Sequence, residues 1–375
     1  PFSGAWTVYQ GFDGQWTHRE KWRHAYDFVI SDADGKHYRN QGNHLGDFYA
    51  YGKPVLSPVN GTVVRVLTEL PDNPIGKPDK INNWGNYIII KNDSGFYTEI
   101  SHFAFRSIRV NVGDRVQIGD ILGLCGNSGY SFEPHIHIQV QHSDLPGDST
   151  IPFHFSTYVE GDCFRNQGLP ADNTLVENLL TRNAPKILSE WLLDRSYRLY
   201  IYRRSQEIKD KVEVQGKKIG HVRLKSTMRD NGSGIIESEK GGLYFSVGNG
   251  IYQNYGYYGK DPCLKMIAAA LPIYPLNRTK QIRWNVDMPA GYIYHGLKKM
   301  LLQFVTPFAS GMERCGSVQL AFNGSRRISG KINRRFLSKP INVDIELDHQ
   351  FLIEKLVIGD RILVKETGDG FEINK

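Results

Sequence analysis

The most constraining feature of this chain is a pair of histidines, His135 and His137, which opens the alternating run HIHIQVQ. Residues i and i+2 of an extended strand share a face. His135, His137 and Gln139 therefore point the same way, while Ile136 and Ile138 point into a core. Two imidazoles on the polar face of a half-buried strand suit a metal site in a groove, although a His-x-His pair also arises by chance.

The segment before this pair predicts a tight meander of short strands. Turn signals stand at Gly113-Asp114 and Gly119-Asp120, among alternating apolar residues. The run Phe96 to His102 reads as a strand with Thr98, Ile100 and His102 on one face. The loop 126–132 should flank the groove, and its small residues should let an extended peptide lie close to the backbone.

A candidate carboxylate ligand lies near the start of the chain. The strand-like run Tyr26 to Ile30 places alternate apolar side chains in a core and Asp27 on the opposite, groove-facing side. Three histidines could pair with it. His24 lies an odd number of residues from Asp27 and would share the core side. His18 precedes the strand in a polar turn and can fold back onto the groove, whereas His44 lies in a later connection.

Residues 5 to 160 resemble the lysostaphin/LytM-type zinc endopeptidases, which cut peptide cross-links of bacterial cell walls. That family carries a His and an Asp early, a strand-end His in the middle and His-x-His late. The matching series follows the family's order: GNYIII at 85–90, SHF at 101–103, the turns VGDRV at 112–116 and GDILG at 119–123, GNSG at 126–129 and PHIH at 134–137.

The resemblance implies a role for each of five residues. His18, Asp27 and His137 would hold one zinc ion per chain. His102 and His135 would lie beside the metal, where the family's equivalents help to deprotonate water and stabilise the oxyanion. Imidazole suits both tasks because its pKa lies near the working pH. Which of the two does which stays open.

The first ligand departs from the family's pattern. The family usually spaces this His and Asp four residues apart, whereas His18 and Asp27 are nine apart. Members with a Thr-His step before a Tyr-Asp-Phe-like strand are the most similar, which favours His18. The pair His44 and Asp47 also resembles the family's His-x-Gly-x-Asp box but is one residue short. His24 and His44 therefore stay open as first ligands.

Length and composition predict a mostly β protein with two domains. A chain of 375 residues with 20 Tyr, 18 Phe and 38 Gly is long for one domain and favours strands and turns. We expect a LytM-type domain with an antiparallel sheet and groove at 1–165, a helical linker at 166–194, with a helix over 174–193, and a β-rich, sandwich-like accessory domain at 195–375.

Several elements follow from local patterns. Asn60-Gly61 predicts a hairpin between two strands within 54–67. In the C-terminal half, one helix is predicted at Leu264 to Leu271. Strand-like runs there are Tyr197 to Tyr202, Leu243 to Val247, Gln281 to Val286, Val318 to Phe322, Val343 to Leu347 and Phe351 to Val364. No catalytic constellation accompanies them, so the role of this half is not indicated.

Net charge, cysteine spacing and the lack of long apolar runs bear on which partners and which cellular compartment we expect. The net charge of +7 comes from scattered basic residues with no nucleic-acid motif, so we expect no nucleic-acid partner. The four cysteines (Cys125, Cys163, Cys263 and Cys315) show no CxxC spacing, and their disulfide state stays open. No run of 18 apolar residues occurs. Because the sequence begins at Pro1 rather than Met, we expect that an N-terminal part is missing, which could have carried a signal peptide or membrane anchor.

The resulting hypothesis is a periplasmic, envelope-anchored or secreted bacterial zinc metalloendopeptidase acting on peptidoglycan peptides, of unspecified oligomeric state. A catalytically inactive LytM-like regulator is the first alternative, although such relatives typically lack ligands. A cell-envelope binding module in the C-terminal half is the second. Biotinyl and lipoyl carriers share the two Gly-Asp turns, but the sequence has no Met-Lys-Met near Asp114 or Asp120.

Overall fold

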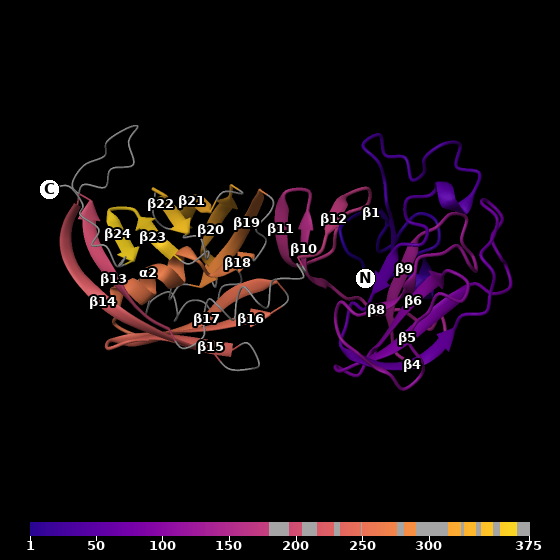
Figure 1. Cartoon of the computed structure of the whole chain (residues 1–375), viewed down its shortest axis with the longest axis horizontal. Coiled ribbons are helices and arrows are strands. Elements are labelled where there is room, and N and C mark those ends of the chain that lie inside the picture. The colour runs from indigo at the N-terminus through magenta and orange to yellow at the C-terminus, as the bar shows by residue number, and fades with distance from the viewer. Residues whose placement is uncertain are drawn as a thin grey trace. The chain divides into compact units, whose positions relative to one another are not determined.

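The computed structural model describes ten ranges of the chain: 1–179, 195–204, 216–228, 233–248, 250–275, 281–289, 314–323, 326–334, 339–347 and 353–365. The chain forms two compact units (Figure 1). Unit 1 comprises residues 1–161 and 165–180, and unit 2 comprises 162–164 and 181–375. The domain limits expected from the sequence stay a prediction.

One antiparallel sheet organises unit 1. Its strands run in the order β10, β12, β1, β2, β9, β6, β5, β4, β7. Their bounds are β1 Ala5–Gln10, β2 Ala25–Val29, β4 Gly61–Leu67, β5 Asn86–Asn92, β6 Tyr97–Phe103, β7 Arg115–Val116, β9 Ile136–Gln141, β10 Phe155–Glu160 and β12 Leu175–Glu177. Strand β11 (Cys163–Gly168) follows β10. Two 3-10 turns, η1 (Glu20–Trp22) and η2 (Leu45–Asp47), lie in the connections.

Strand β9 lies between β2 and β6, which explains how distant parts of the sequence meet. Its His137 is opposite Asp27 of β2 and opposite Ser101 of β6. Side chains directly opposite in an antiparallel pair have Cβ atoms about 5 Å apart. The register alone therefore brings together residues 110 positions apart in the chain.

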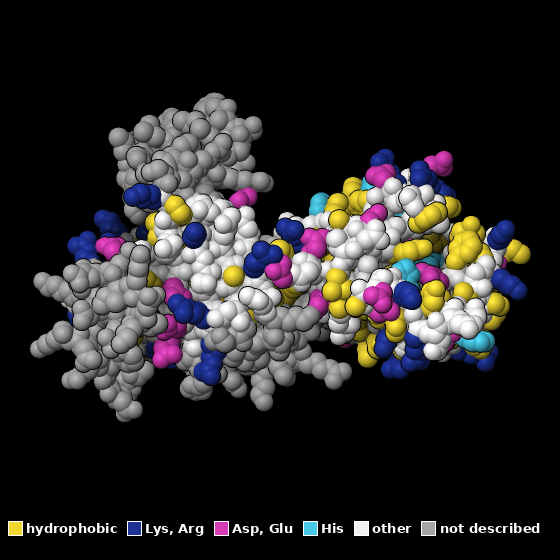
Figure 2. All heavy atoms as spheres, turned by 90° about the horizontal axis from the view of Figure 1, so that it is seen from above, with side chains coloured by type: hydrophobic (Ala, Val, Ile, Leu, Met, Phe, Trp, Pro, Cys, Tyr) yellow, Lys and Arg dark blue, Asp and Glu magenta, His cyan; other side chains and the backbone are white. Residues whose placement is uncertain are grey.

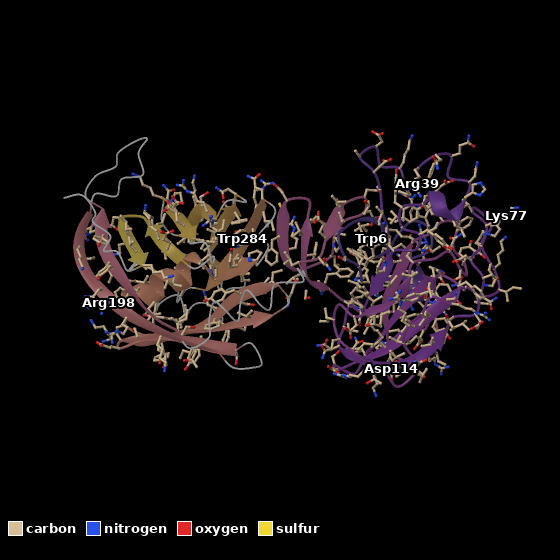
Figure 3. All side chains as sticks on the ribbon, viewed as in Figure 1. Trp6, Arg39, Lys77, Asp114, Arg198 and Trp284 are labelled. Atoms are coloured by element: carbon tan, nitrogen blue, oxygen red, sulfur yellow. The ribbon has the colours of Figure 1, made fainter. Side chains whose placement is uncertain are left out.

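The other face of these strands builds the core of unit 1. Tyr26, Phe28, Ile136 and Ile138 are at most 2% exposed and belong to one apolar cluster. Trp6 of β1 joins it and lies inside the unit in Figure 3. The alternation predicted for both strands is confirmed, and it leaves Asp27 and His137 on the same polar face.

The predicted hairpin at Asn60-Gly61 is wrong. The strand β3 (Pro54–Leu56) pairs with β8 (Ile121–Leu124), and β4 pairs with β5 and β7. The Asn60 side chain instead accepts a hydrogen bond from the Ile118 amide at 2.9 Å, so it closes a contact between distant segments. The two predicted Gly-Asp turns are present, with positive φ at Gly113 and Gly119.

Unit 2 is also mostly β. Its strands pair antiparallel in the order β18, β17, β16, β15, β14, β13, β24, β23, β22, β21, β20, β19. Their bounds are β13 Arg195–Arg204, β14 Gly216–Met228, β15 Ser233–Ser238, β16 Gly241–Gly248, β17 Ile251–Gly259, β18 Ile273–Pro275, β19 Ile282–Pro289, β20 Arg314–Phe322, β21 Arg327–Arg334, β22 Ile341–Leu347, β23 Ile353–Ile358 and β24 Arg361–Lys365.

The one helix predicted in this half is confirmed as α2 (Pro262–Ala270). Asp261 caps it by accepting hydrogen bonds from the amides of Cys263 and Leu264. No helix in the described ranges is long and apolar enough to cross a membrane.

The helix predicted over 174–193 is wrong at its start. Leu175–Glu177 is strand β12, which pairs with both β1 and β10. Val176 is only 3% exposed and belongs to the core of unit 1, and this burial outweighs local helix propensity. Residues 180–193 of that prediction lie outside the described ranges.

Candidate active site

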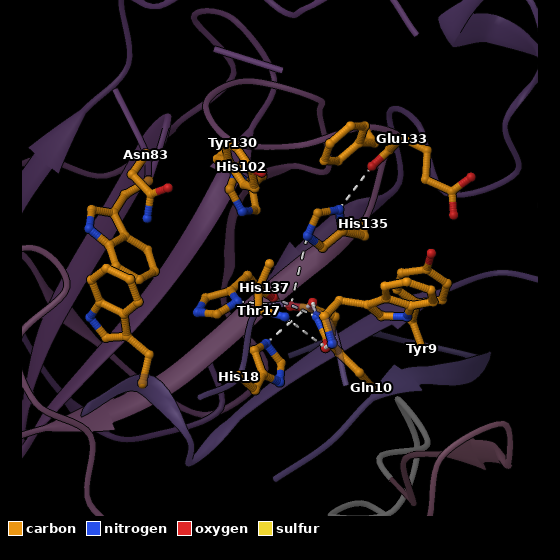
Figure 4. Close-up of a pocket in the computed structure, with 15 residues that line it drawn as sticks. Tyr9, Gln10, Thr17, His18, Asn83, His102, Tyr130, Glu133, His135 and His137 are labelled. Carbon is orange, nitrogen blue, oxygen red and sulfur yellow. Dashed lines mark hydrogen bonds and ion pairs between the residues drawn. The ribbon is translucent and has the colours of Figure 1, made fainter. Parts of the chain in front are cut away.

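Five side chains that the sequence singled out converge in unit 1 (Figure 4). His18 comes from the segment between β1 and β2, Asp27 from β2 and His137 from β9. One potential ligand atom from each of these three lies within 4.8 Å of the others. His18 Nε2 is 3.3 Å from Asp27 Oδ2, and His137 Nδ1 is 2.8 Å from Asp27 Oδ1. All three residues are at most 5% exposed.

Gln10, at the end of β1, explains how His18 reaches a carboxylate nine residues away. Its side-chain amide donates to Asp27 Oδ2 at 2.6 Å and to Thr17 Oγ1 at 2.7 Å. The His18 ring donates from Nδ1 to the Gly11 carbonyl at 2.8 Å. One buried amide thus ties the turn that carries His18 to the strand that carries Asp27. No sequence pattern pointed to Gln10.

His102 and His135 lie beside the three candidate ligands. His135 Nε2 is 3.8 Å from Asp27 Oδ1, and the rings of His102 and His135 are 4.7 Å apart between centroids. Each ring donates from Nδ1 to a backbone carbonyl, His102 to Ser128 at 2.7 Å and His135 to Glu133 at 2.8 Å. In their neutral forms both therefore carry a lone pair on Nε2.

The backbone at His102 is strained. Its φ is +65°, which a residue with a side chain adopts at a cost. Simple alternation along β6 would place His102 with Ile100 in the core. The left-handed conformation turns the ring instead toward His135 and His137. Strain of this kind is typical of residues held in place for a function.

Burial and charge act against each other in this cluster. Burial would raise the pKa of Asp27, but His18 and His135, with a hydrogen bond from His137, hold it well below the usual range. Burial would lower the pKa of His18, but the Asp27 carboxylate raises it above the usual value. Burial, with His135 and His137 nearby, lowers the pKa of His102 well below the usual range. Asp27 is therefore ionised near neutral pH, and His102 is uncharged.

The cluster lies in a cavity of about 550 Å³ with aromatic walls. Trp84 packs against His137 with ring centroids 5.4 Å apart, and Trp22 packs edge-on against Trp84. On the face of unit 1 seen in Figure 2, hydrophobic side chains are exposed beside histidines. The aromatic side chains that line the cavity are Tyr9, Trp16, Trp22, Trp84, Tyr130 and Phe132.

The glycine-rich loop 126–132 flanks the cavity, as predicted, but its glycines contact other parts of the backbone rather than making room for a peptide. A Cβ on Gly129 would lie 2.3 Å from the Gly85 nitrogen, and one on Gly126 would lie 2.3 Å from Ala104 backbone atoms. The small residues thus allow the chain to pack on itself. Tyr130 and Phe132 are the residues of this loop that face the cavity.

The alternative first ligands lie elsewhere. His24 packs edge-on against Phe12 and directs Nδ1 toward the Thr150 carbonyl. His44 is exposed and forms a reciprocal cap with Asp47 around the short turn η2. Neither histidine belongs to the cluster around Asp27.

The donor set fits a zinc ion. His18 Nε2 is buried and makes no hydrogen bond, so the fold leaves its lone pair unsatisfied. Two imidazole nitrogens and one carboxylate oxygen are the ligand types of catalytic zinc sites, which use three protein ligands. Gln10 and Gly11 orient two of the three from outside, as is usual for metal ligands.

The comparison with known families gives a match at residues 42–149, to the family model described as Peptidase family M23. This segment contains His102, His135 and His137 but begins after His18 and Asp27. The curated relatives include a protein described as an uncharacterized metalloprotease of Buchnera aphidicola subsp. Baizongia pistaciae, 43% identical over 89 residues. Another is the glycyl-glycine endopeptidase ALE-1 of Staphylococcus capitis, 33% identical over 111 residues.

These matches are partial. The first covers 24% of this chain and 20% of the relative, and the second covers 27% and 25%. The chain thus spans a quarter or less of the length of both relatives. Among solved structures, the catalytic domain of lysostaphin from Staphylococcus simulans aligns with a TM-score of 0.25 and 19% identity, over 40% of this chain and 88% of that one. A structural likeness at this score adds nothing to the family match.

Proposed function

We propose, from the premise that unit 1 carries a LytM-type domain of peptidase family M23, that this protein is a zinc metalloendopeptidase acting on peptide cross-links of bacterial peptidoglycan. The observation that carries the proposal is the convergence of His18, Asp27 and His137 beside two further imidazoles in one cavity. The name of the relative ALE-1, a glycyl-glycine endopeptidase, supports a peptide substrate.

His18, Asp27 and His137 would hold the zinc ion. When bound, zinc supplies Lewis acidity, which makes water nucleophilic near neutral pH and polarises a carbonyl. Asp27 supplies the one negative charge of the ligand set, and the amide of Gln10 fixes its Oδ2 at 2.6 Å. Trp84 and Trp22 cover the His137 side and limit access of bulk water.

His102 and His135 would move protons. The carbonyls of Ser128 and Glu133 hold both Nδ1 atoms as donors, so each Nε2 is free to accept a proton from water. Once protonated, the same nitrogen becomes a donor that can stabilise an oxyanion or protonate the leaving amine. A neighbouring pair of such imidazoles can divide these two tasks.

The substrate class implies a location outside the cytoplasmic membrane. We propose an envelope or secreted location because peptidoglycan lies there. Unit 2 contributes none of the five clustered residues. We propose that it serves as an accessory domain.

The experiment is to incubate purified peptidoglycan with the full chain and to measure the new amino groups that cleavage of peptide bonds releases. We expect release that stops with a chelator, returns with zinc and is absent in Asp27→Asn. Release of new reducing ends without amines would contradict a peptidase. Zinc binding without any release would favour the inactive-regulator reading.

A further inference from the structure

Glu133 is one of two acidic side chains that line the cavity, and the proposed chemistry gives it no role. The other is Asp27, which belongs to the candidate metal site. No Lys or Arg is among the described residues of the cavity wall, although the chain has 46 Lys and Arg residues against 39 Asp and Glu. Apart from Asp27 and the four histidines around it, the only charged side chain on the described wall is therefore Glu133.

One oxygen of the Glu133 carboxylate is held by the protein and the other is open. Glu133 Oε1 accepts a hydrogen bond from His37 Nδ1 at 2.7 Å, and the Glu133 side chain is 22% exposed. A neutral imidazole can donate this bond, which leaves the carboxylate its full negative charge. Oε2 has no hydrogen-bond partner among the residues that the structure describes. The carboxylate is thus fixed in direction and keeps one oxygen for a donor from outside the chain.

The backbone that carries Glu133 is tied to the candidate catalytic cluster. The Glu133 carbonyl oxygen accepts from His135 Nδ1 at 2.8 Å and from the Ser131 hydroxyl at 2.9 Å. In Figure 4, His135 lies between Glu133 and His137, and Asn83 lies at the opposite end of the cavity. A peptide that lies across His135 and His137 would therefore meet the Glu133 carboxylate beside the bond that is cut, and not at it.

The surroundings of Glu133 suit a cation. Tyr9 lines the same cavity and packs edge-on against His37, with ring centroids 5.5 Å apart. Burial, and then the negative charges of Glu133 and Asp27, raise the pKa of Tyr9 above its usual value. Phe132, the preceding residue, adds a half-exposed ring. Carboxylates and the faces of aromatic rings both attract ammonium groups, whereas a second carboxylate would be repelled here.

We propose that Glu133 is a specificity-determining residue that binds an ammonium group of the peptide substrate beside the scissile bond. An ammonium group offers three N–H donors, one of which can reach Oε2. Either an unblocked peptide N-terminus or the side chain of a diamino acid supplies this group. The inference rests on the proposed function for the cleavage of the peptide, but the binding of an ammonium group in this cavity can be measured without any cleavage.

The first test is peptide binding to the full chain, followed by tryptophan fluorescence because three Trp residues line the cavity. The His102→Ala background keeps the probes intact. One probe pair is a glycine pentapeptide blocked at both ends, with a central lysine that is either free or acetylated. The other pair is pentaglycine amide with a free or an acetylated N-terminus. We expect one free probe to bind about 5- to 10-fold more tightly than its acetylated partner, and that pair identifies the source of the ammonium group.

Glu133→Gln should abolish this preference. The amide keeps an acceptor oxygen for His37 but carries no charge, so the loss reports the charge of Glu133 and not its structural role. The matched control is Glu69→Gln, at an exposed carboxylate that pairs with Arg106 at 2.8 Å and does not line the cavity. This variant should keep the preference. Equal binding of free and acetylated probes in both pairs would overturn the proposal, as would a preference that survives Glu133→Gln or a failure of all the probes to bind.

The second test is hydrolysis of purified peptidoglycan, either native or with its amino groups acetylated beforehand. At low substrate concentration we expect the wild type to release new amines about 5- to 10-fold faster from the native polymer. Glu133→Gln should cut both polymers at the slower rate and keep its zinc. Equal rates in the wild type would overturn the role of Glu133 and leave the peptidase activity standing. If neither polymer is cut, the proposed function fails, while the binding test still decides whether Glu133 holds an ammonium group.

Discussion

At the scale of single residues, substitutions of His102 and His135 can show that proton transfer and zinc binding depend on different side chains. Both lie beside the Asp27 cluster, and neither supplies an atom to its three-ligand set. We expect His102→Ala and His135→Ala to keep the zinc content of the wild type. Hydrolysis should fall by about 10²- to 10⁴-fold, the usual contribution of a general acid or base. Elemental analysis beside the amine-release assay measures both; loss of zinc in either variant would make that histidine a ligand.

Glu99 gives unit 1 a stability that depends on pH. Burial raises the pKa of this carboxyl from 4.5 to about 7, against hydrogen bonds from Gly147 and Ser101. The folded state thus keeps a proton that the unfolded chain has lost, so stability is highest below about pH 4.5 for this group and falls as pH rises to about 7. The full effect is of order 3 kcal/mol.

The measurement is urea unfolding of the wild type and Glu99→Gln at several pH values between 5 and 8. The amide keeps an acceptor for the Gly147 amide and cannot ionise. The wild type should therefore lose stability relative to Glu99→Gln as pH rises to 7, and the difference should level off above that. Parallel stability curves for the two proteins would show that Glu99 ionises normally.

The alternation of side chains along regular strands predicted much of the site from the sequence. It failed where the backbone departs from a regular strand. Alternation placed Asp27 and His137 on polar faces because both lie within regular strands. The same rule put His102 beside Ile100, and it failed because φ of +65° at His102 reverses the side chain. Gln10 could not be found, since its role depends on a turn that only the folded chain brings back to Asp27.

At the scale of elements, the loop that carries Ser128 depends on a close backbone contact. Gly129 has φ of +79°, and a Cβ there would meet the Gly85 nitrogen at 2.3 Å. Gly129→Ala should therefore shift the Ser128 carbonyl that orients His102. We expect a loss of about 3 kcal/mol or more in unfolding free energy, from strain and clash together, with a parallel loss of hydrolysis.

Gly95 provides the matched control for this substitution. It lies in the turn between β5 and β6 with φ of +92°, and a Cβ there would meet nothing within 4 Å. Gly95→Ala should cost only the strain of positive φ, about 1 to 2 kcal/mol, and leave hydrolysis intact. Equal effects of the two variants in chemical unfolding and in activity would argue against the loop contact.

The elements that could be predicted from the sequence are those that contain several apolar residues close together. The helix α2 and strands such as β16 and β20 carry dense apolar runs. Strand β14 (Gly216–Met228) was missed because its sequence GKKIGHVRLKSTM has few apolar residues among its Lys, Arg and His residues and contains two glycines. The hairpin at Asn60-Gly61 failed for another reason: the choice of strand partner, β8 for β3, is made by tertiary packing rather than by the turn.

At the scale of the whole molecule, the extent of unit 1 is open to a direct test. The fragment 1–165 would lack β12, whose Val176 is 3% exposed and lies in the core. We expect the fragment 1–179 to fold and bind zinc, and 1–165 to be less stable by about 2 kcal/mol or more, through loss of that burial and of pairing with β1. Equal stabilities of the two fragments in urea would place the end of the unit near 165.

Zinc content by elemental analysis, on the wild type beside His18→Ala and His44→Ala, decides whether His18 and Asp27 belong to a zinc site. His18 is buried with its Nε2 facing Asp27, whereas His44 is exposed at a distant turn. We predict about one zinc per chain in the wild type and in His44→Ala, and almost none in His18→Ala. Zinc retained by His18→Ala would show that His18 is not a ligand, and zinc absent from wild-type protein never exposed to chelators would show that the Asp27 cluster is not a zinc site.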